Sequence, residues 1–199
     1  MKKKKLSVHH LVQIGMFGAL AAILMLFEFP LPFIAPPFYE LDLSEVPVLI
    51  GTFSMGPVAG VLIELIKILL KLVIKGTSTA YVGDVANFAI GCCFLLPAGV
   101  MYKVRRTRKC AVRGMVLGTL VMASVGGLIN AYIMLPFFSQ FYGIPLDGLI
   151  QMGTEVNGLI TSLPTFVLIA VVPFNLVKGA LVSLITMLVY KRVRILIHE

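Results

Sequence analysis

The residues with the clearest chemical potential lie near the C-terminal end, in the stretch Pro173-Phe174-Asn175-Leu176-Val177-Lys178-Gly179. This stretch interrupts an apolar run, from about residue 163 to residue 190, that is long enough to cross a lipid bilayer. Asn175 and Lys178 are three residues apart, so on a helix they share one face. An amide and an ammonium group at membrane depth are costly unless they line a polar cavity or have partners. We therefore interpret the chain as a set of helices that build a pocket around this pair.

The composition places the chain among membrane proteins. Of its 199 residues, 59% are hydrophobic and only 13% are charged, and the mean hydropathy is +1.00. So few charges could not cover the surface of a soluble protein of this size. The apolar segments follow one another without a soluble insertion, so we expect one all-α, polytopic domain over residues 1–199, without a cleavable signal peptide. The three cysteines are expected to be packing residues, and no metal site is expected.

The distribution of basic residues predicts how the chain is oriented in the cell membrane. Most of the 17 Lys and Arg residues precede the first apolar run, occupy a central loop, or follow the last run. By the positive-inside rule these three clusters are cytoplasmic, together with both termini. They also suit anionic lipid headgroups, and no nucleic-acid partner is expected. Their members are Lys2 to Lys5; Lys103, Arg105, Arg106, Arg108, Lys109 and Arg113; and Lys191, Arg192 and Arg194.

Six transmembrane helices are predicted, at about residues 8–27, 45–56, 58–74, 84–101, 112–135 and 163–190. The second is too short to cross a bilayer of about 30 Å as a straight helix, so it either includes part of the preceding loop or is sheltered by protein. The segments 28–44, 75–84 and 136–162 are then outer loops. The first of them is rich in proline, which favours a stiff, extended backbone. This loop is either a plain connector or a lid that closes a ligand pocket, and its aromatic residues favour the lid.

The first predicted helix carries a stripe of small residues. Gly15 and Ala19 are four residues apart, as are Gly18 and Ala22. Such a stripe allows another helix to approach closely. It is either ordinary packing within this protein or a docking face for a separate membrane subunit.

Charged residues on the third predicted helix also follow helical spacing. Glu64, Lys67, Lys71 and Lys75 share one face, which must look inward or towards water. Glu64 with Lys67 is a plausible intramembrane ion pair. The group is either a structural or subunit-contact stripe or a proton relay, and we favour the former.

Further polar residues lie in the second outer loop and in the helices beside it. The small and hydroxylated residues of segment 75–84 offer hydrogen bonds to a ligand. Asp84 is either the N-cap of the fourth predicted helix or a ligand contact. Asn130, near the outer end of the fifth, is either an interhelical hydrogen-bonding residue or part of the same pocket as Asn175 and Lys178.

Six motifs in order along the chain resemble those of the riboflavin-specific S components of energy-coupling factor (ECF) transporters. They are Phe29-Pro30-Leu31-Pro32-Phe33, Leu41-Asp42-Leu43-Ser44-Glu45-Val46-Pro47, Phe53-Ser54-Met55-Gly56-Pro57-Val58-Ala59-Gly60, Ala86-Asn87-Phe88, Leu128-Ile129-Asn130-Ala131-Tyr132 with Leu135-Pro136, and the Pro173 to Gly179 stretch. The resemblance covers nearly the whole chain. It implies a six-helix membrane protein that binds riboflavin from outside with high affinity, as a substrate and not as a cofactor of its own.

The resemblance also implies partners and site residues. S components work with the transmembrane coupling subunit EcfT and two cytoplasmic ATP-binding subunits, and this chain has no GxxxxGK[ST] phosphate loop to hydrolyse ATP itself. The positions that match are Asn130, Asn175 and Lys178 at the flavin ring edge; Glu40, Leu41, Asp42 and Glu45 in or beside the lid and ribityl site; Gly83 and Asn87 as looser assignments; and Gly15, Gly18, Ala19 and Ala22 for docking on the coupling subunit.

These residue types suit riboflavin chemically. The vitamin has a flat aromatic ring, a polar pyrimidine edge and a polyol tail. Asn offers a donor and an acceptor and Lys offers donors, while Phe and Tyr can cover the ring. Carboxylates accept hydrogen bonds from ribityl hydroxyls and repel the phosphate of flavin mononucleotide, so a preference for the dephosphorylated vitamin is predicted.

Two other transport functions remain open at this point. One is an S component for a different vitamin, and the other is a stand-alone proton-coupled solute carrier that relies on Glu64 and Lys67. An enzyme is not expected, because the sequence has no paired-carboxylate motif and no histidine near a plausible nucleophile.

Overall fold

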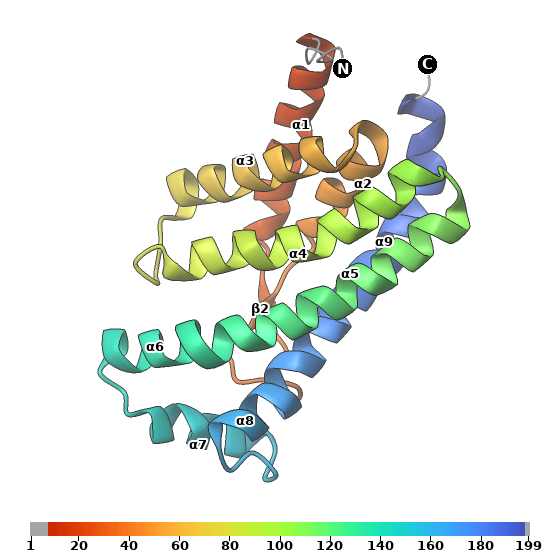
Figure 1. Cartoon of the computed structure of the whole chain (residues 1–199). Helices are drawn as coiled ribbons and strands as arrows, with labels where there is room; N and C mark the ends of the chain where they lie inside the picture. Colours follow the sequence, from red (N-terminus) through yellow and green to blue (C-terminus); the bar gives the residue numbers. More distant parts are fainter. Residues whose placement is uncertain (1–7, 198–199) are drawn as a thin grey trace.

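The computed structural model describes residues 8–197, and within them the chain is a bundle of helices with one small two-stranded sheet (Figure 1). The basic cluster Lys2 to Lys5 lies outside the described residues. The elements in chain order are α1 (Val8–Met25), β1 (Phe29–Pro30), β2 (Glu40–Leu41), α2 (Glu45–Met55), α3 (Pro57–Lys75), α4 (Val82–Val104), α5 (Arg108–Ile129), η1 (Asn130–Met134), α6 (Leu135–Tyr142), α7 (Leu146–Val156), α8 (Leu163–Phe166), η2 (Val167–Val171) and α9 (Val172–Ile197).

Within the described residues, four helical stretches are long and apolar enough to cross a membrane, namely Val8–Met25, Val82–Val104, Arg108–Tyr142 and Leu163–Val189. The other two predicted membrane helices correspond to α2 and α3. With 11 residues, α2 is only about 17 Å long, and everything from Glu45 to Phe53 is buried. The burial of α2 therefore favours the explanation that this short helix is sheltered by surrounding protein. Helix α3 has 19 residues and carries the four charged residues of the predicted stripe.

The two longest helical stretches each contain a π-helical segment just before a proline. Segment η1 precedes Leu135-Pro136, and η2 precedes Val172-Pro173. Proline has no backbone N–H, and its ring crowds the carbonyl group four residues earlier, which a wider turn relieves. The helix thus continues past Pro136 to Tyr142 and ends at Gly143, whose φ is +66°. The prediction of a loop over 136–162 is wrong for most of its length, because α6 and α7 occupy it.

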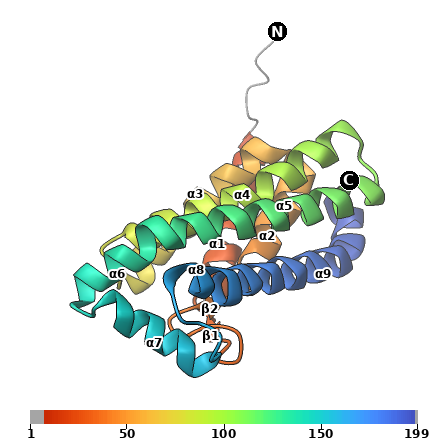
Figure 2. The same cartoon turned by 60° about the horizontal axis from the view of Figure 1, so that its bottom comes forward.

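Two apolar cores hold the elements together. The larger one lies among α1 to α5 and α9 and includes Leu49, Ile63 and Phe94. The second lies where the segment between α1 and α2 packs on α6, α7, α8 and the start of α9 (Figure 2). Strands β1 and β2 pair antiparallel, with Phe29 opposite Leu41, and so close the proline-rich segment into a loop.

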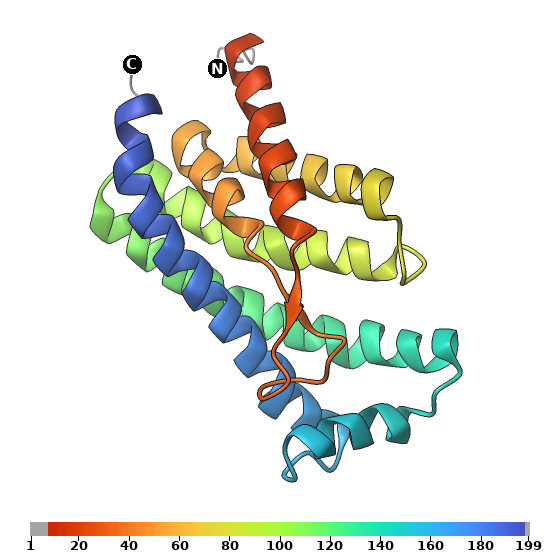
Figure 3. The same ribbon diagram turned by 180° about the vertical axis from the view of Figure 1, so that it is seen from behind.

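The start of α1 and the end of α9 lie at the same end of the molecule, together with the α2–α3 and α4–α5 turns (Figures 1 and 3). The exposed basic residues of the α4–α5 turn therefore lie near both ends of the described chain. The proline-rich loop, the α3–α4 loop and the α6–α7 turn lie at the opposite end. This separation brings the polar residues of the pocket together, away from the basic residues of the α4–α5 turn.

Candidate ligand-binding site

A cavity of about 340 Å³ lies at the end of the bundle that carries the proline-rich loop, because residues of this loop and of the α3–α4 loop line it. Its volume falls within the range of small-molecule sites. Its walls come from the end of α1, the proline-rich loop, α3, the α3–α4 loop, α4, η1, α6 and α9. Six of the predicted site residues line it: Glu40, Gly83, Asn87, Asn130, Asn175 and Lys178.

The cavity lining includes the two amides and the ammonium group that are predicted to hydrogen-bond the edge of a flavin ring. Asn130 and Asn175 are both buried. Each amide nitrogen donates to a backbone carbonyl one turn earlier, Asn130 Nδ2 to Gly126 O at 2.8 Å and Asn175 Nδ2 to Val171 O at 2.9 Å. These bonds hold the amide planes in place before any ligand arrives.

Lys178 is held by a carboxylate from a distant part of the chain. Its Nζ lies 2.8 Å from Asp42 Oδ2, and the two side chains are 12% and 3% exposed. Asp42 Oδ1 also accepts a hydrogen bond from the backbone N–H of Ser44. Burial by itself would raise the pKa of Asp42, but Lys178 and Lys67 outweigh it and lower that pKa below its usual range. Asp42 is therefore an ionised partner behind Lys178, outside the cavity lining.

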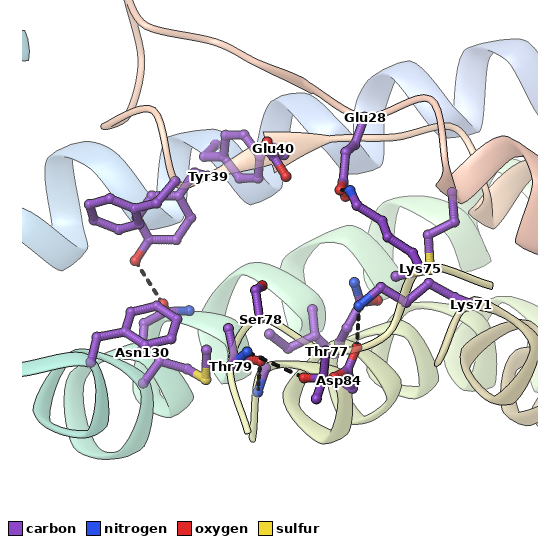
Figure 4. A pocket seen from close by; sticks show the side chains of 18 of the residues that line it. Glu28, Tyr39, Glu40, Lys71, Lys75, Thr77, Ser78, Thr79, Asp84 and Asn130 are labelled. Atoms are coloured by element: carbon purple, nitrogen blue, oxygen red, sulfur yellow. Dashed lines mark hydrogen bonds and ion pairs between the residues drawn. The ribbon is translucent and has the colours of Figure 1, made fainter. Parts of the chain in front are cut away.

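The proline-rich loop contributes aromatic and hydroxyl groups. Tyr39 Oη donates a hydrogen bond to Asn130 Oδ1 at 2.7 Å (Figure 4). Its ring lies 4.9 Å from that of Phe38 and 5.6 Å from that of Phe174, centroid to centroid. Burial raises the pKa of Tyr39, so the phenol stays neutral and remains a donor. The loop thus covers one side of the cavity with aromatic rings and occupies the Asn130 acceptor.

A polar wall is formed by α3, the α3–α4 loop and the start of α4, and it contains the hydroxylated segment that was expected to offer hydrogen bonds to a ligand. Sequence reasoning missed that Lys71 and Lys75 of α3 belong to this wall. Lys71 Nζ lies 2.6 Å from Asp84 Oδ1, and Thr77 Oγ1 donates to Asp84 Oδ2 at 2.7 Å (Figure 4). The N-cap position of α4 belongs to Tyr81, so the N-cap interpretation of Asp84 is wrong. The signal was present in the sequence, because the lysine stripe of α3 continues along one helical face to this end of the molecule.

The cavity lining carries both acidic and basic side chains. Lys75 forms an ion pair with Glu28, at the root of the proline-rich loop. Burial and the neighbouring Glu28 raise the pKa of Glu40. Among the lining lysines, Lys71 and Lys75 pair with lining carboxyls, whereas Lys178 pairs with Asp42 behind the lining. The predicted preference for the dephosphorylated vitamin considered the acidic residues alone, and it stays a prediction.

Besides Asp42, two more of the predicted site residues do not line the cavity. Leu41 is the second residue of β2 and is buried in the apolar core beneath the loop. Glu45, at the start of α2, turns into the bundle because Lys67 Nζ lies 2.7 Å from its Oε1. The expected ion pair of Glu64 with Lys67 is also present, at 2.6 Å.

The small-residue stripe of α1 divides into two parts. A Cβ atom on Gly18 would lie 2.5 Å from Ile66 Cγ2 of α3, and Ala22 is buried. These two residues allow close packing inside the protein. Ala19 is exposed, and a Cβ on Gly15 would meet open space. Only the second pair is available to another subunit.

The fold and the cavity together define a membrane-embedded ligand-binding protein. A model of the substrate-specific component of ECF transporters matches residues 9–190, and the chain belongs to this family. A solved structure described as the S component of a bacterial ECF transporter superposes with a TM-score of 0.75 and 33% identity, covering 96% of this chain and 98% of the other.

Named relatives point to one vitamin. Riboflavin transporter RibU of Staphylococcus aureus is 33% identical over 182 residues, which cover 92% of this chain and 88% of that protein. Riboflavin transporter FmnP of Bacillus subtilis is 30% identical over 190 residues, covering 95% and 94%. A further RibU, from Lactococcus lactis, is 30% identical and covers 88% of both chains.

Proposed function

We propose that this chain is the high-affinity riboflavin-binding S component of an ATP-driven ECF vitamin transporter. The observation that carries the proposal is that one cavity is lined by fixed amides and a lysine, by aromatic rings and by the hydroxyl groups of the α3–α4 loop. These are the three surfaces that a flat ring, its polar edge and a polyol tail require. Family membership and the riboflavin transporters among the relatives support the same ligand.

In this proposal the isoalloxazine ring lies against Phe38, Tyr39 and Phe174. Its pyrimidine edge meets Asn175 and Lys178, whose donors and acceptors are already oriented. The ribityl chain then points towards Asp84 and the hydroxyl groups of the α3–α4 loop. Asn130 either exchanges its bond to Tyr39 for one to the flavin or holds the tyrosine over the ring.

The orientation and partners follow the same proposal. All six predicted helices embed the protein in the cell membrane, with α3 tolerated because its buried charges pair inside the bundle. Both termini lie in the cytoplasm, and the cavity opens outside under the proline-rich lid. EcfT meets the face of α1 that carries Gly15 and Ala19, and two ATP-binding subunits complete the module.

The test is to purify the full chain and look for bound flavin by absorbance and fluorescence. Protein from riboflavin-containing medium should be yellow, and protein freed of flavin should bind added riboflavin. Asn175→Ala should weaken that binding, whereas Asn157→Ala, at an exposed amide outside the cavity, should not. Colourless protein that also fails to bind added riboflavin would contradict the substrate, and binding of another vitamin in the same assay would replace it.

A further inference from the structure

A cluster of buried charges lies behind the cavity and takes no part in the proposed binding site. It consists of Glu45 on α2 and of Glu64 and Lys67 on α3, with side chains at most 2% exposed. Lys67 Nζ lies 2.7 Å from Glu45 Oε1 and 2.6 Å from Glu64 Oε1. One ammonium group therefore faces two carboxyl groups.

The surrounding elements do not supply the missing positive charge. The nearest other charged groups are Asp42 and Lys178, and these two already pair with each other at 2.8 Å. Helix α4 faces the cluster with Gly91 and the thiol of Cys92. If every carboxyl group were ionised, the region would hold three negative and two positive charges. An unbalanced buried charge is so unfavourable that such a group takes up a proton instead.

The hydrogen bonding of Glu64 locates that proton. Among the residues that the structure describes, neither oxygen of Glu64 has a hydrogen-bond partner, because Lys67 approaches Oε1 outside hydrogen-bonding geometry. Glu45 Oε2 also lacks a partner within the described part of the chain. A Cβ atom on Gly91 would lie 2.4 Å from Glu64 Oε1 and 3.0 Å from Glu45 Oε1, so both carboxyl groups lie beside this glycine.

We propose that Glu64 carries a proton in the folded protein and donates it in a hydrogen bond to the Glu45 carboxylate. Protonation leaves Lys67 balanced by Glu45 alone and gives Glu64 a donor for the neighbouring oxygen. The proton is retained and not transported, because none of the three side chains lines the cavity. The cluster is thus a proton-holding site that fixes α2 to α3 beneath the ligand pocket. It rests on buried charge and does not depend on the identity of the ligand.

The first measurement is thermal unfolding of the full chain in detergent between about pH 6 and pH 10. A proton held in the folded state stabilises the protein at low pH, and this contribution is lost as rising pH removes the proton. Glu64→Gln keeps an uncharged donor at every pH, so it should fold and lose less stability at alkaline pH than the unsubstituted chain. Glu155→Gln, at an exposed acid on α7, should behave like the unsubstituted chain.

The second measurement is infrared spectroscopy at neutral pH. The C=O stretch of a protonated carboxylic acid should be present in the unsubstituted chain and in Glu155→Gln, and absent from Glu64→Gln. An identical band in all three proteins would overturn the proposal. So would alkaline destabilisation of Glu64→Gln in parallel with the unsubstituted chain, or its failure to fold, because an isosteric neutral group should replace a protonated one.

Discussion

Replacing Lys178 by methionine tests two roles of this residue, which are to hydrogen-bond the ligand and to neutralise Asp42. In the folded chain its ammonium group both lines the cavity and lies 2.8 Å from Asp42 Oδ2. Methionine keeps most of the side-chain volume and removes the charge. We expect Lys178→Met to insert into the membrane, to be less stable than the unsubstituted chain and to bind riboflavin more weakly.

The two losses have different magnitudes. Breaking one side of a buried ion pair costs about 3–5 kcal/mol, because the remaining carboxylate is left without a partner. The 3% exposure of Asp42 means that water offers it little compensation. A hydrogen bond from a charged donor to a ligand contributes about 1.5–3 kcal/mol, so the dissociation constant should rise roughly ten- to a hundredfold.

The assay is titration with riboflavin, followed by quenching of flavin fluorescence, alongside thermal unfolding. The double variant Lys178→Met/Asp42→Asn removes the stranded carboxylate, so it should recover stability and still bind weakly. Lys103→Met, at an exposed lysine at the other end of the molecule, is the matched control. Binding by Lys178→Met within twofold of the unsubstituted chain would refute the ligand contact. Full recovery of affinity in the double variant would show that the single loss came from Asp42.

Three further predictions use the same protein. Ala19→Leu should leave stability and riboflavin binding unchanged but abolish uptake in cells that contain the complete transporter. Ala22 is buried, so Ala22→Leu should instead lower the unfolding temperature by overpacking, at a cost of about 1–3 kcal/mol. Normal uptake with Ala19→Leu would exclude the exposed face of α1 as the docking surface. Tyr39→Phe removes the hydrogen bond to Asn130 and should speed riboflavin release severalfold, from a loss of about 1 kcal/mol; an unchanged release rate would mean that ring packing alone holds the loop. The lysine partners of Asp42 lower its pKa, so the ion pair of Asp42 stabilises the fold above the ordinary carboxyl pKa of about 3.9, and this stabilisation is lost as the pH falls further. Asp42→Asn should therefore lose less stability than the unsubstituted chain on acidification below about pH 4. Equal losses of stability in the two proteins would contradict this prediction.

Local sequence patterns were sufficient to predict the membrane class, the approximate helices and the polar pair on the last one. Apolar run length and helical periodicity depend on neighbours within a few residues, so they can be read without a fold. The same periodicity placed Glu64 and Lys67 on one face, and the structure pairs them. The continuation of the fifth helix past Pro136 was missed because a π-helical turn accommodates a proline that would otherwise end the helix.

Contacts between distant segments could be decided only by the tertiary structure. Lys178 pairs with Asp42, 136 residues earlier in the chain, and this ion pair offsets the cost of burying the lysine in the cavity wall. Glu45 lies three residues from Asp42 but is drawn away from the cavity by Lys67. The division of the α1 stripe into an inner and an outer pair likewise depends on where α3 packs.

The Asn175 and Lys178 pair illustrates both limits. Its spacing and its apolar surroundings indicate by themselves that a polar cavity must exist at this level of the membrane. The charge balance of that cavity is set by lysines and carboxylates from three other segments, because electrostatic interactions depend on distance in space and not on separation in sequence.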